Sequence, residues 1–180
     1  MSGQQSAPEV TLRRAVPGDE SRLSLVGAAT FLDSYARLLP AADIIAHAAH
    51  QHAPAVYARW LEDGGSFCWL CEQPPGDAPV GYAVATRPDL PMPDIAEDDL
   101  EIRRIYLLHR YQRGGLGRRL MQAVEQAARE AGMRRLLLGV YSRNTAALDF
   151  YARLGFSEAG TRQFRVGANH YFDYILQRRL

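Results

Sequence analysis

The sequence predicts an α/β (α+β) fold, with one mixed and mostly antiparallel sheet that carries helices on both faces. Strand-like and helical patterns follow one another in the order β-α-α-β-β-β-α-β-α-β-β. Residues 136–140 form a short apolar run that suits a strand buried on both faces. Turn sequences at 74–78 and 167–169 join neighbouring strands into hairpins. These observations favour one layered domain without repeats.

The composition is that of an ordinary globular protein. The chain has 180 residues (20.1 kDa), of which 47% are hydrophobic and 23% charged, and its formal net charge is +1. This balance argues against nucleic acid or an anionic membrane as the partner, and no apolar run approaches the ~20 residues that span a bilayer. The first residues lack the basic head and apolar core of a secretory signal. We therefore expect a flexible arm at 1–8, a single domain at 9–180 and a cytoplasmic protein.

The first third of the chain is predicted to be a strand followed by two helical regions. Residues 9–15 alternate between apolar and polar side chains, which is typical of a half-buried strand. Pro17 opens a helical stretch that Pro40 ends, and a second helical region covers 41–63 with an interruption at Pro54. The first helix is expected to bury the face formed by Leu25, Ala28, Leu32, Tyr35 and Leu39.

The rest of the chain alternates strands with two further helices. Strands are expected at 66–73, 79–86, 100–108 and 136–140. A proline-rich loop at 87–98 precedes the third of these. A helix that begins at Leu116 is stopped by Gly132, and another at 145–154 is closed by Gly155. The chain ends in a hairpin with strands at 156–166 and 170–176.

Cys68 and Cys71 form the sequence CWLC, which invites a redox or zinc interpretation. Both lie in a predicted strand, where three steps separate them by about 10 Å and turn them to opposite faces. That separation exceeds what a disulfide tolerates, and no second Cys/His pair has zinc-ligand spacing. We interpret the two cysteines as buried small apolar residues.

A glycine-rich turn joins the central strand to the helix that follows it. The segment Gln112-Arg113-Gly114-Gly115-Leu116-Gly117 lets the backbone approach a ligand closely, because glycine has no Cβ. The first amides of the helix have no intrahelical acceptor, and positive charge is added by Arg113, Arg118 and Arg119. The turn therefore suits a phosphate or pyrophosphate, although a surface loop with solvated arginines fits the same residues.

Two other phosphate-binding patterns fit this turn poorly. A Walker loop needs Gly-Lys-Ser/Thr at the helix start, whereas Gly117 is followed by Arg118. A dinucleotide fingerprint read from Gly115 needs a small residue where Leu120 stands. It also needs an acidic residue about 20 positions further on, near the apolar residues 136–138. The details therefore disfavour both nucleotide-binding classes.

The turn follows a strand with the pattern Q-x-x-G-x-G, and a second motif comes after it. Residues 144–156, NTAALDFYARLGF, match N-x-x-A-x-x-F-Y-x-x-x-G-F. The two motifs, in this order and on these elements, resemble the GNAT superfamily of N-acetyltransferases, from about Val10 to the C-terminus. The segments FLDSYARLLP and YFDYILQRRL are similar to bacterial small-molecule members near the PaiA-like polyamine acetyltransferases.

The resemblance implies an acetyl-CoA site without a metal. Main-chain groups of Ile105, Tyr106 and Leu107 would run alongside the pantetheine arm, where two parallel strands diverge. Asn144 would bond the pantetheine or cap its helix, and both roles fit its position. The pyrophosphate would be held by Gln112 at the start of the turn and by the amides of Arg113, Gly114, Gly115, Leu116, Gly117 and Arg118.

Acetyl transfer from a thioester to an amine makes three chemical demands. A neutral amine attacks, a fixed donor stabilises the oxyanion, and the leaving thiolate takes a proton. A main-chain amide near Leu107 is expected to hold the oxyanion. Tyr151 fits as the acid, and a core tyrosine with its hydroxyl at the rim is the alternative. Glu101 stands eleven positions before Gln112, where some histone-acetylating relatives keep a catalytic glutamate, but an exposed strand-end glutamate fits equally well.

The two N-terminal helical regions are expected to form a lid over the acceptor end of the sheet. His47 and His50 lie one turn apart, and Asp43 lies one turn before His47. A metal cluster is conceivable there, but an exposed polar helix face explains the same spacing. On the lid hypothesis, the residues that face the acceptor are Phe31, Asp33, Tyr35, His47 and His50.

The sequence thus predicts an acetyl-CoA-dependent N-acetyltransferase that transfers directly to a primary amine of a small molecule, such as a polyamine or amino compound. A covalent intermediate is not expected, because neither cysteine lies near the motifs. A protein N-terminus or lysine is the alternative acceptor, and a non-catalytic acyl-CoA binding or sensing module is the alternative function. The acceptor, the strictness for acetyl-CoA as donor and the choice between monomer and homodimer stay open.

Overall fold

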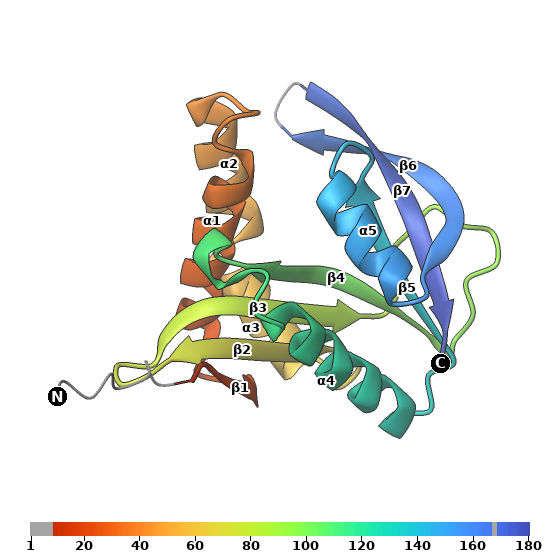
Figure 1. The fold of residues 1–180 in the computed structure, drawn as a ribbon, viewed down its shortest axis with the longest axis horizontal. Coiled ribbons are helices and arrows are strands. Elements are labelled where there is room, and N and C mark those ends of the chain that lie inside the picture. The colour runs from red at the N-terminus through yellow and green to blue at the C-terminus, as the bar shows by residue number, and fades with distance from the viewer. Residues whose placement is uncertain (1–8, 167–168) are drawn as a thin grey trace, which may run out of the picture.

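The computed structural model describes residues 9–166 and 169–180, so the arm predicted at 1–8 and part of the turn at 167–169 lie outside the described residues. Within them the strands form one sheet in the order β1-β2-β3-β4-β5-β7-β6 (Figure 1). The strands are β1 (Thr11–Arg14), β2 (Phe67–Gln73), β3 (Ala78–Thr86), β4 (Asp99–Leu107), β5 (Arg135–Tyr141), β6 (Ser157–Val166) and β7 (Asn169–Arg179).

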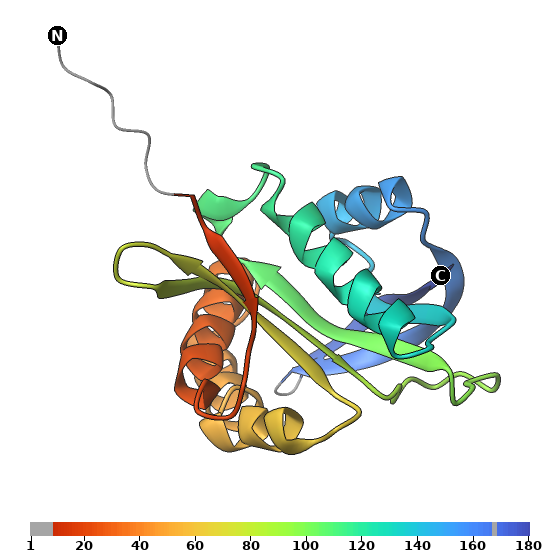
Figure 2. The same cartoon turned by 90° about the horizontal axis from the view of Figure 1, so that it is seen from below.

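Helices cover both faces of this sheet, which confirms the predicted fold class. We call the two sides the α1 face and the α4 face after the helices that pack on them, and Figure 2 shows one set below the sheet and the other above it. The α1 face carries α1 (Glu20–Tyr35), α2 (Ala41–Gln51) and α3 (Pro54–Glu62). The α4 face carries α4 (Leu116–Glu130) and α5 (Thr145–Arg153), and a 3₁₀ turn, η1 (His109–Tyr111), precedes α4.

Among the described residues, β4 and β5 are the only neighbouring strands that pair parallel, and their register is short. β4 and β5 pair from Asp99↔Arg135 to Glu101↔Leu137, and beyond that point no ladder joins them. The other neighbours pair antiparallel, with a register shift in the β3–β4 ladder between Val84 and Ala85. The C-terminal half of β4 therefore leaves one edge open toward β5, and the two strands diverge in Figure 1.

Separate apolar clusters occupy the two faces. The cluster on the α4 face includes Leu120, Val124 and Leu138, and the cluster on the α1 face includes Leu23, Tyr57 and Val84. Cys71 belongs to the first cluster and Cys68 to the second, and both are free and buried. The prediction that the two cysteines are buried on opposite faces of a strand is confirmed.

The predicted buried face of the first helix is wrong. Leu25 and Leu32 are 63% and 53% exposed. The helix instead packs with the side formed by Leu23, Val26, Gly27, Thr30 and Phe31. Both sides show apolar residues at helical spacing, so periodicity alone favoured the wrong one. Contacts with β3 and α3 decide between them.

The remaining boundaries fall close to those predicted from the sequence. Pro54 separates α2 from α3 because it begins a new helix at its first position. Gly132 and Gly155 follow α4 and α5 with φ of 76° and 84°, as helix-ending glycines do. No helix in the described part of the chain is long and apolar enough to cross a membrane.

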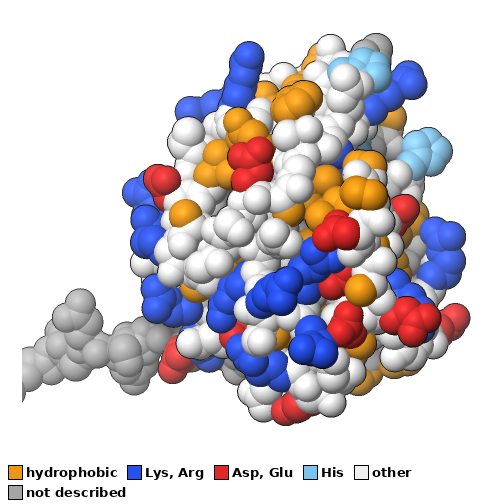
Figure 3. All heavy atoms as spheres, turned by 90° about the vertical axis from the view of Figure 1, so that its right-hand side faces the viewer, with side chains coloured by type: hydrophobic (Ala, Val, Ile, Leu, Met, Phe, Trp, Pro, Cys, Tyr) orange, Lys and Arg blue, Asp and Glu red, His pale blue; other side chains and the backbone are white. Residues whose placement is uncertain are grey.

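Ion pairs fasten the parallel ends of β4 and β5 to the loop that precedes β4. Arg135 Nη2 lies 2.6 Å from Asp99 Oδ2, and Arg135 Nη1 lies 2.8 Å from Asp94 Oδ2. Basic and acidic side chains are interspersed on the side of the molecule in Figure 3. The two strands are thus held together at one end while they separate at the other.

Candidate active site

The open edge of β4 presents main-chain amides toward the gap between β4 and β5. Leu108 N donates to Val80 O at 2.9 Å, so the amide of Leu108 faces β3. Amide directions alternate along a strand, and the amides of Ile105 and Leu107 therefore face the gap. They are available to a ligand that lies along the strand there.

The segment after β4 folds back against the end of the strand. Gln112 Nε2 donates to Leu107 O at 3.1 Å, which anchors the start of the turn. Arg113 and Gly115 then adopt left-handed backbone conformations, with φ of 66° and 83°. A side chain at 115 would be strained in this conformation, which favours glycine where the turn enters α4.

The turn and the first residues of α4 form an anion cradle. The first helical hydrogen bond runs from Arg119 N to Gly115 O, so the preceding amides are those that a helix start presents to an anion. A Cβ built at Gly114 or Gly115 would meet no atom within 4 Å. Arg113 and Arg118 lie in the same segment and add positive charge. The residues present fit a pyrophosphate.

The second motif lies beside this gap. Asn144 Oδ1 accepts a hydrogen bond from Ala147 N at 3.1 Å, so this side chain caps α5, one of its two predicted roles. Tyr151 packs in the cluster that also contains Ile105, Leu107 and Val140. Burial raises the pKa of Tyr151, and Tyr106 adds to the rise. The phenol is therefore neutral at pH 7.

Comparison with known proteins decides the family. The family model described as Acetyltransferase (GNAT) family matches residues 30–156. The chain belongs to the GNAT acetyltransferase family. An uncharacterized N-acetyltransferase of Mycobacterium tuberculosis is 41% identical over 101 residues, which is 56% of this chain and 60% of that protein. An uncharacterized N-acetyltransferase of Lactobacillus delbrueckii is 33% identical over 101 residues, 56% of this chain and 58% of that protein.

Solved GNAT structures share the fold at low sequence identity. A PaiA N-acetyltransferase from Thermoplasma acidophilum, in complex with coenzyme A, has a TM-score of 0.74 at 15% identity. That match covers 96% of this chain and 100% of the PaiA protein. The ribosomal-protein-S18-alanine N-acetyltransferase from Escherichia coli has a TM-score of 0.65 at 20% identity, covering 95% of this chain and 94% of that one.

In this GNAT chain, Glu101 is buried rather than exposed at a strand end. Only 3% of the residue is accessible, which rules out the exposed alternative. Its Oε2 accepts from Asp89 N at 2.8 Å and lies 3.5 Å from Arg103 Nη1. Leu100 and Ile102 belong to the α4-face cluster, so the intervening Glu101 points to the α1 face.

The lid residues predicted from the sequence have several different environments. Asp33 Oδ2 accepts from His109 N at 2.7 Å, so Asp33 joins α1 to the start of η1, which precedes the glycine-rich turn. His47 stacks on Phe31 with ring centroids 4.0 Å apart, whereas His50 is exposed. Asp43 Oδ2 accepts from Asn169 Nδ2 at 3.2 Å, a contact between α2 and β7. The described residues hold no group of three or more His, Cys, Asp or Glu side chains suited to a metal.

Sequence reasoning missed a polar cluster under these helices. Arg104 Nη1 donates to the Tyr57 hydroxyl at 2.9 Å and lies 3.2 Å from His52 Nδ1. The Tyr57 hydroxyl lies 2.8 Å from the same nitrogen. Burial lowers the pKa of His52 to about 3, and the charges of Arg104 and His47 add to this. The absence of a side chain at Gly27 leaves room for this cluster. A Cβ at that position would overlap both the Tyr57 hydroxyl and the His52 ring.

Proposed function

We propose that this protein transfers an acetyl group from acetyl-CoA to a primary amine of a small molecule. The observation that carries the proposal is the gap between β4 and β5, bordered by outward-facing amides and by Tyr151 and followed by an anion cradle. A pantetheine arm needs the first feature, and a pyrophosphate needs the second. The cradle lies directly beyond the end of β4, so one extended molecule can occupy both.

Different residues are assigned to different parts of acetyl-CoA, the acetyl donor. The amides of residues 113–118 and the guanidinium groups of Arg113 and Arg118 would hold the pyrophosphate. The main chain of Ile105, Tyr106 and Leu107 would lie along the pantetheine. Asn144 uses its oxygen as a helix cap, so its Nδ2 is the group we assign to the pantetheine.

The chemistry then follows from the groups at the gap. The amine nitrogen attacks the thioester carbon, and the Leu107 amide stabilises the oxyanion that develops. The C–S bond breaks as the intermediate collapses, and the Tyr151 hydroxyl donates its proton to the departing thiolate. Its raised pKa keeps Tyr151 protonated throughout the range in which amines are nucleophilic.

Glu101 is the base that we assign to the amine. It lies on the α1 face of β4, as do Arg104, which donates to the Tyr57 hydroxyl of α3, and Tyr106, which stacks with Tyr82. Its Oε2 already accepts from Asp89 N at 2.8 Å. We therefore propose that Glu101 receives the amine proton through water rather than by direct contact.

Two measurements test the function. Calorimetry with acetyl-CoA should give a saturable heat, and release of free CoA should follow when amines are added. The panel should contain n-butylamine, 1,4-diaminobutane, spermidine and a short peptide with a free N-terminus. We expect turnover with at least one of the small amines. Acetyl-CoA binding without transfer to any amine would favour an acyl-CoA sensor, and transfer to the peptide alone would favour protein acetylation.

A further inference from the structure

A buried carboxylate on β7 lacks part of its hydrogen bonding. Asp173 is 4% exposed, and its Oδ2 accepts from Arg162 Nε at 3.1 Å. Its Oδ1 is buried and has no hydrogen-bond partner among the described residues. Buried polar atoms are nearly always paired, and an unpaired carboxylate oxygen costs more than a neutral one. Such an atom indicates a ligand that supplies the missing donor.

The Asp173 side chain belongs to the α1 face. Ile175 packs there with Leu90 and Leu137, and side chains two apart in a strand share a face. Tyr171 and Asp173 therefore point to the same side as Ile175. In the ladder Asp173 lies opposite Tyr141 of β5. The Arg162 side chain lies over β5 at Gly139. A Cβ built at Gly139 would come within 3 Å of the Arg162 guanidinium group.

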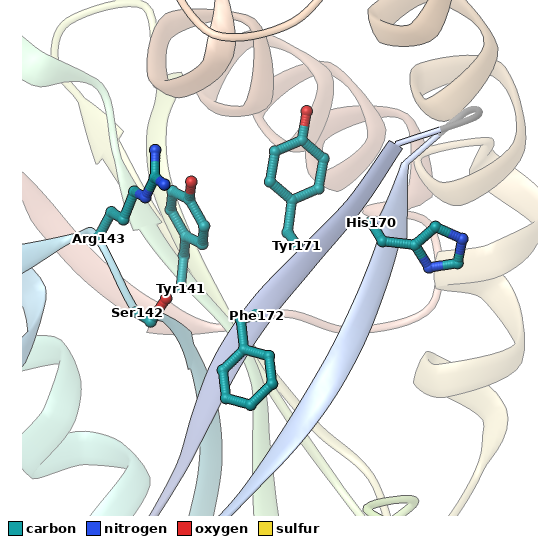
Figure 4. A pocket seen from close by; sticks show the side chains of 6 residues that line it. All are labelled: Tyr141, Ser142, Arg143, His170, Tyr171 and Phe172. Atoms are coloured by element: carbon teal, nitrogen blue, oxygen red, sulfur yellow. The ribbon is translucent and has the colours of Figure 1, made fainter.

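Two aromatic rings lie on the same face as this carboxylate, because Tyr141 is opposite Asp173 in the ladder and Tyr171 precedes it by two residues. The rings of Tyr141 and Tyr171 have centroids 5.6 Å apart and are nearly perpendicular. Figure 4 shows both rings on one side of the strands and Phe172 on the other. Tyr171 also packs against the cluster of α1 and α2 that includes Tyr35. A hollow of about 260 Å³ borders the two tyrosines, and its lining consists of Tyr141, Ser142, Arg143, His170, Tyr171 and Phe172, so Asp173 lies next to the hollow in sequence without lining it.

Two further tyrosines lie on the α1 face: Tyr35 of α1 packs against the same cluster as Tyr171, and Tyr106 of β4 stacks with Tyr82. Although Tyr106 is 36% exposed as a residue, desolvation of its phenol raises its pKa, as it does for Tyr35, and the Asp173 carboxylate adds to the rise at each of them. Asp173 is therefore within electrostatic range of both hydroxyls. Tyr106 also belongs to the segment of β4 that we assign to the pantetheine. The carboxylate thus lies on the same face of the sheet as the Tyr106 side chain, which belongs to the strand segment assigned to the donor.

We propose that Asp173, with Tyr35, Tyr106, Tyr141 and Tyr171 around it, is the subsite that holds the ammonium group of the acceptor. An alkylammonium supplies the N–H donors that Oδ1 lacks, and aromatic faces attract the same cation. Asp173 carries a single negative charge with which Arg162 is already paired, so one ammonium group, as in a monoamine or at one end of a diamine, fits better than a highly charged chain. This inference rests on the proposed function and specifies its acceptor class.

The decisive experiment measures amine binding without turnover. Protein saturated with CoA is titrated calorimetrically with 1,4-diaminobutane, in the wild type, in Asp173→Asn and in Asp77→Asn. Asp77 lies exposed in the β2–β3 turn with a φ of 52°, which asparagine tolerates, so it is the matched control. We expect Asp173→Asn to weaken diamine binding at least tenfold, and Asp77→Asn to leave it unchanged.

Kinetic measurements on the same variants separate this subsite from a structural role. Asp173→Asn should raise KM for the amine more than it lowers kcat, with the acetyl-CoA Kd and the Tm close to those of the control. Tyr171→Leu, a milder change, should raise the amine KM several-fold.

Diamine binding within twofold of the wild type in Asp173→Asn, or no binding by the wild type, overturns the inference. A parallel loss of acetyl-CoA affinity also overturns it. Failure of the proposed function is distinct, because it appears as absent acetyl-CoA binding or absent CoA release in the wild type.

Discussion

The two sides of the gap between β4 and β5 offer different chemical groups to a ligand, main-chain amides on one side and side chains on the other. Toward α4, the groups that suit a ligand are the main-chain amides of Ile105, Leu107 and residues 113–118. Toward α1, they are side chains from separate segments, namely Tyr35, Tyr106, Tyr171 and Asp173. A main-chain site constrains backbone conformation and therefore fixes glycines and spacing. A side-chain site constrains only which groups meet in space. The first leaves a sequence motif, and the second does not.

The same difference extends to how each side is stabilised. The cradle is a local structure, in which Gln112 bonds to Leu107 five residues earlier and Gly115 is the N-cap of α4. The α1 face depends on contacts between distant segments, such as Asp33 with His109 and Asp43 with Asn169. Changes near the cradle should therefore alter catalysis or donor binding, whereas changes under α1–α3 should also alter stability.

The largest effect is expected from Tyr151→Phe. The ring contacts with Phe150 and Phe156 survive, with centroids at 5.3 and 5.6 Å, while the proton donor is lost. We expect kcat to fall about 100-fold or more, as for removal of a general acid. Tyr174→Phe is the control, because Tyr174 packs against the same cluster. Stopped-flow release of CoA measures kcat, and full turnover in Tyr151→Phe would exclude this residue as the acid.

Acid should destabilise the α1 face through His52. Its pKa is about 3 in the folded protein, whereas an unfolded histidine has about 6.5. The unfolded state thus binds the proton first as the pH falls, so the stabilisation is complete above pH 6.5 and decreases toward pH 3. At pH 5 the loss is about 2 kcal/mol from this group. Urea unfolding at pH 7.5 and pH 5 measures it.

His52→Asn should flatten that pH dependence, because it removes the titrating group. His50→Asn is the control, since His50 lies exposed at the end of the same helix. An equal pH dependence in His52→Asn and the wild type would mean that other groups govern acid unfolding. His47, with a pKa lowered by burial to about 4, is then the first of these to replace.

The sequence predicts the α4 side of the molecule more fully than the α1 side. The strand, turn and helix at 99–130 and the helix at 145–153 form where their glycines and apolar periodicity indicated. The buried face of α1 was predicted wrongly, because Leu25 and Leu32 repeat with the same period as Leu23 and Thr30. Local patterns do not reveal which apolar stripe meets the sheet.

The polar groups on the α1 face were missed for a related reason. His52, Tyr57 and Arg104 meet across 52 positions of sequence, and Arg162 meets Asp173 across a strand pair. Taken one at a time, each of these residue types is common either on the surface or in the core, so none of them signals a buried polar cluster. Only the register of β7 against β5 and β6 turns Asp173 inward, and a shift of one residue would reverse it.

Donor binding should be sensitive to charge at Gly114. A side chain there meets no atom within 4 Å of its Cβ, so Gly114→Asp places a negative charge beside the cradle without a clash. We expect the acetyl-CoA Kd to rise about tenfold, which corresponds to about 1.4 kcal/mol. Gly114→Asn is the uncharged control, and higher salt should reduce the difference between the two variants. Equal Kd values would place the pyrophosphate elsewhere.

The smallest effect is expected from Glu101→Gln. This variant tests whether a side chain on the α1 face takes part in the reaction at the gap. The carboxamide oxygen can still accept from Asp89 N, so the loop before β4 stays in place. Because water stands between this residue and the amine in our proposal, we expect a several-fold fall in kcat/KM and a displaced acidic limb of the pH–rate profile. Asp89→Asn is the control, since the exposed Asp89 side chain pairs with Arg103, the same residue that lies near the Glu101 carboxylate. An unmoved profile would leave Glu101 as an anchor for that loop and assign proton removal to another group on the α1 face.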